Sequence, residues 1–107
     1  MVVVSPNLIN QHILSSSLLK EAHQIIESDE ELSTLLKMSN VMAVTRLKYN
    51  DHGITHARIV AGAALEMTDI LSGSGVEFTT IRDGITKNID EVKLVVLLSG
   101  YMHDIGN

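Results

Sequence analysis

Two short stretches of the sequence contain the side chains best suited to metal chemistry. HGITHARIV carries His52 and His56, and SGYMHDIGN carries the adjacent pair His103 and Asp104. Imidazole nitrogens and carboxylate oxygens are common ligands of divalent transition metals. His103 and Asp104 lie at the end of the most apolar segment, where burying a polar group without a partner costs a few kcal/mol. A divalent cation would offset that cost, so this pair predicts a metal site.

The two histidines of the first stretch differ in their expected conformation. Residues four apart face the same side of a helix, and two histidines at that spacing often hold one metal ion. Gly53 and the turn residues before it argue against a helical conformation at His52. We therefore predict His56 as the ligand, in the first turn of a helix, with His52 as an auxiliary neighbour. Two other interpretations stay open: His52 is a capping or surface residue, or His52 and His56 alone form a structural metal site.

The adjacent pair imposes a geometric condition of its own. Neighbouring helical residues point about 100° apart, so His103 and Asp104 can serve one metal only where a helix ends. The Ile105-Gly106 sequence that follows is consistent with such an end. The competing interpretation is that both side chains simply point into water.

Apolar residues recur near a 3.6-residue period, which predicts an all-α bundle of about four helices. The first helix is expected over residues 10–27, with apolar positions at Ile13, Leu14, Leu18, Ala22, Ile25 and Ile26. His12 and His23 fall on it among Ser, Gln and Glu, so we predict that both face solvent without a role. Ser28 and Glu31 form a capping-box pattern for a second helix, whose apolar positions are Leu32, Leu35, Leu36, Met42 and Leu47.

Two further helices are expected to carry the candidate ligands. Thr55 is predicted to cap a third helix that continues to about residue 71, with buried positions at Ile59, Ala63, Met67 and Ile70. The small residues at 61–64 would let another helix approach closely. The last helix, over residues 90–104, is apolar nearly all round, which predicts a place at the centre of the bundle. Between these helices, residues 73–89 are expected to form a short strand or an extended loop.

Composition narrows the class of protein. The 107 residues fit one domain, expected over 1–107, and 45% of them are apolar, enough to form a core. The formal net charge is −5 without a basic cluster, which argues against non-specific nucleic-acid binding. The sequence has no cysteine, no basic signal-peptide region and no apolar run long enough to cross a bilayer. We therefore expect a cytoplasmic protein with no membrane segment.

The two stretches together resemble the motifs of the HD-domain phosphohydrolases. In that superfamily an all-α core uses a first histidine, a His-Asp doublet and a distant aspartate to bind divalent metal. By resemblance, His56 in THARIV takes the place of the first histidine. His103 and Asp104, 47 residues after it in LLSGYMHDIG, take the place of the doublet. The resemblance covers residues 50–107.

The resemblance implies metal-dependent hydrolysis of a phosphomonoester, a phosphodiester or a nucleotide. The cation would be Mn²⁺, Fe²⁺, Co²⁺, Ni²⁺, Zn²⁺ or Mg²⁺, held by His56, His103 and Asp104. Asp104 would also act as the catalytic residue that orients the attacking water. Arg58, two residues after His56, would contact substrate phosphate or simply lie on the surface. The partner would be a small phosphorylated molecule.

The resemblance also has a departure that affects the expected activity. The family's closing aspartate comes tens of residues after the doublet, and no residue after Asp104 can supply it. We therefore expect the N-terminal part of an HD-domain core, inactive or weakly active as this chain. The alternative is a non-catalytic helical interaction module with a vestigial metal site. The apolar last helix would also leave surface uncovered, which predicts a homo-oligomer.

Overall fold

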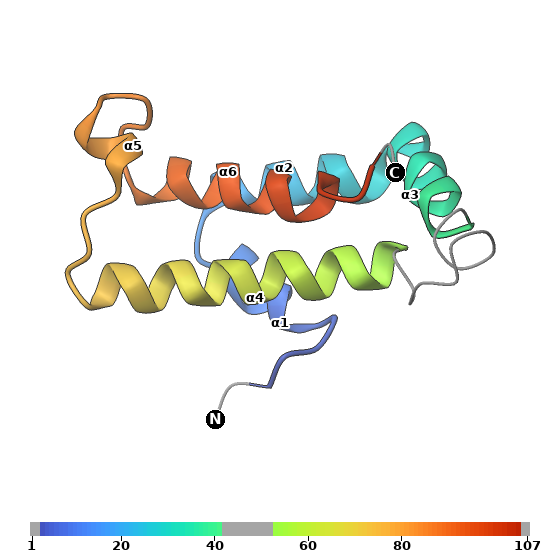
Figure 1. Cartoon of the computed structure of the whole chain (residues 1–107), viewed down its shortest axis with the longest axis horizontal. Helices are drawn as coiled ribbons and strands as arrows, with labels where there is room; N and C mark the ends of the chain where they lie inside the picture. Colours follow the sequence, from blue (N-terminus) through green and yellow to red (C-terminus); the bar gives the residue numbers. More distant parts are fainter. Residues whose placement is uncertain (1–2, 42–52, 106–107) are drawn as a thin grey trace.

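The computed structural model describes residues 3–41 and 53–105, and every regular element in them is a helix (Figure 1). The helices are α1 (Leu8–Ile13), α2 (Ser17–Ser28), α3 (Glu30–Val41), α4 (Ile54–Gly73), α5 (Thr79–Arg82) and α6 (Ile89–Met102). Four of them are three turns or longer, which confirms the predicted all-α bundle of about four helices. None of the described helices combines the length and the apolar content that a bilayer crossing requires.

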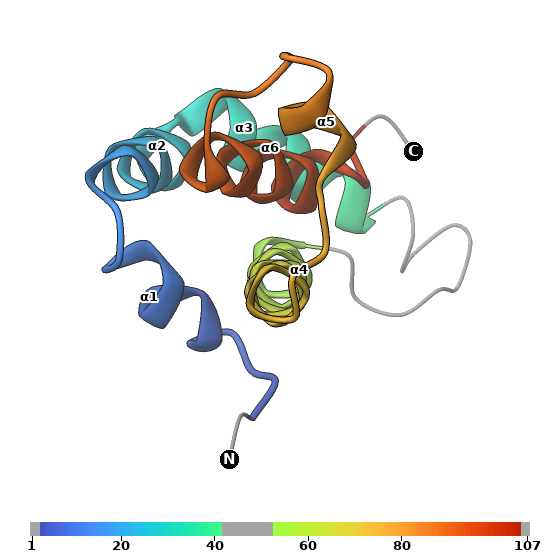
Figure 2. The same ribbon diagram turned by 90° about the vertical axis from the view of Figure 1, so that its left-hand side faces the viewer.

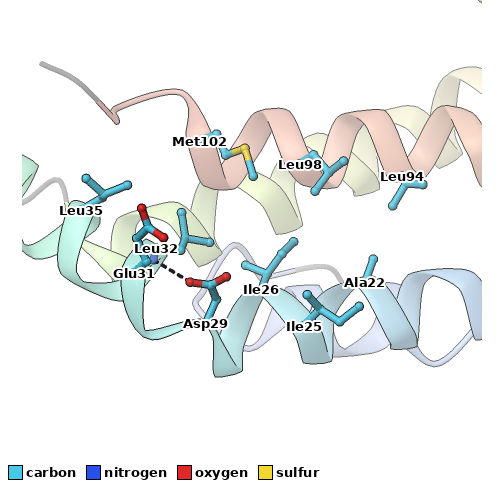
Figure 3. Close-up of a pocket in the computed structure, with 10 residues that line it drawn as sticks. All are labelled: Ala22, Ile25, Ile26, Asp29, Glu31, Leu32, Leu35, Leu94, Leu98 and Met102. Carbon is cyan, nitrogen blue, oxygen red and sulfur yellow. Dashed lines mark hydrogen bonds between the residues drawn. The ribbon is translucent and has the colours of Figure 1, made fainter.

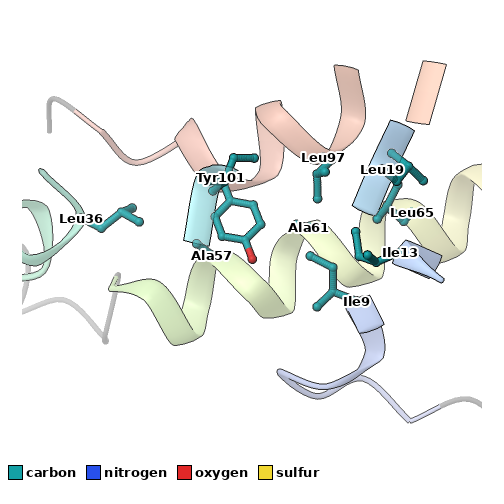
Figure 4. Close-up of a cluster of buried hydrophobic side chains, with 10 residues drawn as sticks. Ile9, Ile13, Leu19, Leu36, Ala57, Ala61, Leu65, Leu97 and Tyr101 are labelled. Carbon is teal, nitrogen blue, oxygen red and sulfur yellow. The ribbon is translucent and has the colours of Figure 1, made fainter. Parts of the chain in front are cut away.

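Helices α1, α2, α4 and α6 surround most of the hydrophobic core, and α3 contributes Leu36. Viewed end-on, α2 and α6 form one layer, and α1 and α4 lie beneath them (Figure 2). Helix α6 packs against α4 and α2, and α1 packs against the same two helices. Between them lies an aliphatic core with one aromatic ring (Figure 4), formed by Ile9, Ile13, Leu19, Ile26, Leu36, Ala57, Ala61, Leu65, Leu97 and Tyr101.

The close contact of α4 with its neighbours depends on small residues. A Cβ atom at Gly100 of α6 would lie 2.6 Å from the Cα of Ala61 and 2.7 Å from its Cβ. A Cβ at Gly62 would lie 2.9 Å from the backbone nitrogen of Ile9 in α1. Helix α4 therefore meets α6 and α1 on adjacent small residues. This confirms the prediction that the patch at 61–64 allows another helix to approach closely.

The prediction of one helix over residues 10–27 is wrong, because this stretch contains parts of two helices, α1 and α2. The backbone leaves the helical conformation at Ser16, whose side chain accepts a hydrogen bond from the Leu19 nitrogen and so caps α2. The Ser15 hydroxyl donates to the carbonyl of His12 in the last turn of α1. Serine side chains compete in this way with helical hydrogen bonds. The break changes the phase of the buried face, and Leu14 and Ile25, both predicted apolar-face residues, are exposed.

Two predicted helix starts are each shifted by one residue or more. Helix α3 is capped by Asp29, whose carboxylate accepts from the Leu32 nitrogen at 2.9 Å. The hydroxyl of Ser28 instead donates to carbonyls at the end of α2. Helix α4 begins directly after Gly53, so Thr55 is a first-turn residue and not the cap. The predicted apolar positions Met42 and Leu47 lie outside the described residues.

The predicted faces of the two long helices also need correction. In α4, the buried side chains follow a four-residue spacing at Ala57, Ala61 and Leu65, whereas Met67 and Ile70 are exposed. The reason is that α1 and α6 pack against the small residues, not against the bulkier ones. Helix α6 is likewise not enclosed, because Val95 and Met102 are exposed. Residues 73–89 contain the single turn of α5 and no strand.

Candidate metal centre

The three predicted metal ligands come together at one end of the helix pair α4 and α6. These helices pack against each other and run in opposite directions (Figure 1). The first turn of α4, which carries His56, therefore lies beside the end of α6, where His103 and Asp104 follow its last residue. The helix end also meets the geometric condition that the adjacent pair imposes, because both side chains turn toward His56.

The ligand atoms of these residues form a small triangle. The Nε2 atoms of His56 and His103 are 3.3 Å apart, and Asp104 Oδ2 lies 3.4 Å from the first and 3.0 Å from the second. Two ligands about 2.1 Å from one metal ion are about 3.0 Å apart at a right angle and about 3.4 Å apart at the tetrahedral angle. All three edges of the triangle fall within this range. One divalent cation could therefore contact all three atoms with little rearrangement.

The orientation of His103 is set by the backbone. Its Nδ1 lies 2.8 Å from the carbonyl oxygen of Gly100, one turn earlier. A carbonyl oxygen can only accept, so Nδ1 donates this hydrogen bond. In the neutral ring the lone pair is then on Nε2, the atom beside His56 and Asp104, where it could bind a metal ion. A hydrogen bond of this kind on the second ring nitrogen is the usual way in which a protein fixes the tautomer of a metal-binding histidine.

Burial differs among the three ligands. The Asp104 side chain is 12% exposed, whereas the side chains of His56 and His103 are 31% and 37% exposed. The carboxylate thus lies on the protein side of the triangle and the imidazoles reach the surface. Metal sites that perform catalysis keep a position open for water or substrate beside three protein ligands. Among the described residues, the exposed side of the two imidazoles is where such a position would lie.

The two auxiliary candidates differ in what can be said of them. His52 lies outside the described residues. Arg58 points toward α2, where its Nε and Nη2 both lie 2.8 Å from Glu27 Oε1. Residues two apart on a helix point about 200° apart, which is why Arg58 and His56 leave α4 on different sides. The hydrogen bond to Glu27 raises the pKa of the Arg58 guanidinium, with burial opposing it. The substrate contact proposed for Arg58 stays a prediction.

His12 was predicted to face solvent, and this prediction is wrong. It is buried on α1, with Nδ1 2.9 Å from Asp69 Oδ2 and Nε2 2.8 Å from Glu66 Oε2, both on α4. Lys93 of α6 forms an ion pair with the other oxygen of Asp69. The network joins three helices. The neighbours of His12 on its own helix give no sign of this network, because its partners are more than 50 positions away in the chain.

His23 was also predicted to face solvent, and this prediction is wrong: its side chain is 19% exposed and forms a second buried polar group with Tyr101. Their rings meet edge to face, with centroids 6.2 Å apart. Within the described residues, neither His23 Nε2 nor the Tyr101 hydroxyl has a hydrogen-bond partner, although both are buried. Burial raises the pKa of the Tyr101 hydroxyl, and the negative charge of Glu27 adds to the effect.

Replacing Tyr101 with phenylalanine is expected to be neutral or to stabilise the fold by about 0.5 kcal/mol near pH 7, because it removes an unpaired buried hydroxyl. The folded state holds the Tyr101 proton more tightly than the unfolded state. The stability linked to this proton is therefore fully present below about pH 10 and is lost as the pH rises further. Urea unfolding of both proteins across this range should show a smaller alkaline loss in the variant. Equal alkaline losses would contradict the prediction.

Comparisons with known proteins give one relative and no family. No family model matches the chain, and no solved structure matches it. An uncharacterized protein of Methanocaldococcus jannaschii, MJ1020, is 47% identical over 79 residues. The match covers 74% of this chain and 30% of the relative, so the chain spans under a third of that protein's length. The geometry of the candidate metal centre is therefore what bears on the function of this chain.

Proposed function

We propose that His56, His103 and Asp104 bind a divalent cation and that this centre belongs to a metal-dependent phosphohydrolase of the HD-domain type. The observation that supports the proposal is the triangle of ligand atoms, with edges of 3.0 to 3.4 Å. The order of the ligands along the chain also fits the resemblance, with one histidine before an adjacent His-Asp pair. The substrate would be a phosphoester of a small molecule or nucleotide.

The chemistry follows from the ligand set. A divalent cation supplies Lewis-acid activation of a phosphoester and of the attacking water. The residues of this chain would provide its position: the His103 imidazole is fixed through Gly100, and Asp104 contributes the negative charge from the buried side. Two imidazoles with one carboxylate suit Mn²⁺, Fe²⁺, Co²⁺, Ni²⁺ and Zn²⁺, and Mg²⁺ is the least favoured of the candidates because it prefers oxygen ligands.

Calorimetric titration with Ni²⁺ and with Mn²⁺ tests the metal site. We expect saturable binding of one equivalent to the unaltered chain and a loss of affinity of about a hundredfold or more in the His103→Ala variant. Removing a residue that merely orients a ligand already costs about ten- to a hundredfold, so removing a ligand should cost at least as much. Asp104→Asn, which keeps the shape but removes the charge, should show a similar loss.

The His52→Ala variant is the matched control, since it removes a neighbouring imidazole. Binding that survives in it but not in His103→Ala supports the proposed centre. The reverse result would support a structural site made by His52 and His56 and would contradict the proposal. Thermal unfolding of each metal-free variant, followed by circular dichroism, separates loss of a ligand from loss of the fold.

Hydrolysis needs a separate test, because a metal site without activity would fit a non-catalytic interaction module. Within the described ranges, the candidate group contains three ligands. Metal-dependent cleavage of a nitrophenyl phosphate ester, lost in Asp104→Asn, would support the phosphohydrolase. Metal binding without turnover would support the interaction module. The structural feature that favours such a module is the apolar groove between α2, α3 and α6. The predicted homo-oligomer stays a prediction.

A further inference from the structure

An apolar groove runs between α2, α3 and α6 (Figure 3). It has a volume of about 410 Å³, and its apolar lining consists of Ala22, Ile25, Ile26, Leu32, Leu35, Leu94, Leu98 and Met102. Several of these side chains are open to solvent: Ile25 is 60% exposed and Met102 is 45% exposed. Large side chains of this kind are usually covered when they gather in one concave surface.

The shape of the groove suits a helix. Leu94, Leu98 and Met102 follow one another at four-residue spacing along α6, which makes one wall about 12 Å long, or just over two helical turns. Ala22, Ile25 and Ile26 form the opposite wall on α2. Two parallel rows of apolar side chains are the usual seat of an amphipathic helix, which inserts anchors spaced three or four residues apart.

The charged residues that line the groove are all acidic. Asp29 and Glu31 line it beside Leu32 and Leu35, near the start of α3, and no lysine, arginine or histidine is among its described lining residues. Positively charged groups placed at the edges of an incoming helix would thus meet complementary charge.

We propose that this groove is the docking site of an amphipathic helix from outside residues 1–107, with an apolar face and lysine or arginine at its edges. A second copy of the chain is a poorer occupant. Its net charge is −5, so a second copy would on balance bring negative charge to a groove whose charged lining residues are acidic. The proposal does not depend on the metal centre.

The test uses a labelled amphipathic peptide of about 15 residues, long enough to form a helix on binding. Leucines at helical spacing form its apolar face and lysines its edges. A second peptide has glutamate in place of every lysine. Fluorescence anisotropy with the intact chain should show saturable binding of the lysine peptide and at least about tenfold weaker binding of the glutamate peptide, a difference that shrinks as salt is added.

Two pairs of variants locate the binding. Ile25→Ser should weaken it about tenfold, whereas Ile70→Ser should not; Ile70 is 58% exposed on α4, against 60% for Ile25, and does not line the groove. Glu31→Gln should weaken it severalfold and Glu30→Gln, in the same first turn, should not.

Four results would count against the proposal. Equal affinity for both peptides would remove the charge argument. Binding that is insensitive to Ile25→Ser would place the peptide elsewhere. A self-association in sedimentation equilibrium that Ile25→Ser abolishes, without peptide binding, would assign the groove to a second copy. Absence of both peptide binding and self-association would also count against the proposal.

Discussion

Replacement of Gly100 by alanine is expected to lower the free energy of unfolding by about 3 kcal/mol, the upper end of the usual cost of overpacking. The added Cβ would lie 2.6 Å from the Cα of Ala61, a backbone atom that cannot rotate away. Helices α4 and α6 would have to separate. The shift should also move His103 away from His56, because the two lie on opposite sides of this same contact. Urea unfolding measures the first effect, and Ni²⁺ titration of the folded fraction measures the second.

Gly73→Ala is the matched control for this prediction. Gly73 is the last residue of α4, and a Cβ there would meet nothing within 4 Å. The control should change the free energy of unfolding by no more than about 1 kcal/mol. The expected direction is an increase, since alanine loses less backbone entropy than glycine in a helix. Unchanged stability in Gly100→Ala would mean that the helices are not held at the distance described here. Reduced stability with unchanged nickel affinity would separate the helix contact from the metal centre.

The His12→Ala variant should show the second large effect. It would leave the Glu66 and Asp69 carboxylates without the imidazole that contacts both of them. Because the side chains of Glu66 and Asp69 are 23% and 39% exposed, solvent would compensate in part, and we expect a loss of about 2 kcal/mol, below the cost at fully buried pairs. Thermal unfolding would measure it as a lower Tm.

An exposed ion pair provides the comparison for His12. Arg82 and Asp83 are adjacent, with side chains 58% and 54% exposed, so Arg82→Ala should change stability by less than about 0.5 kcal/mol. A similar small change in His12→Ala would show that the network contributes no more than a surface pair. His12→Gln, which can still hydrogen-bond to one carboxylate, should recover part of the loss if the hydrogen bonds matter.

The sequence was sufficient to predict the helical class and the metal-capable residues. Apolar spacing near 3.6 residues is a local property, and it identified α2, α3, α4 and α6 approximately. His56, His103 and Asp104 could be selected because imidazole and carboxylate groups stand out in apolar surroundings. The small residues at 61–64 predicted a close helix contact for an equally local reason, the absence of bulk.

Tertiary structure alone decided which residues meet. The faces of α4 could not be predicted from periodicity, because Met67 and Ile70 are apolar yet α6 and α1 pack against Ala61 and Gly62. The partners of His12 are distant in the chain, so no spacing rule could find them. The division at Ser16 depended on a side-chain hydrogen bond that competes with the helix. Side-chain type limits the chemistry that is available, but antiparallel packing of α4 and α6 brings His56 within 3.4 Å of the two candidate ligands that follow α6.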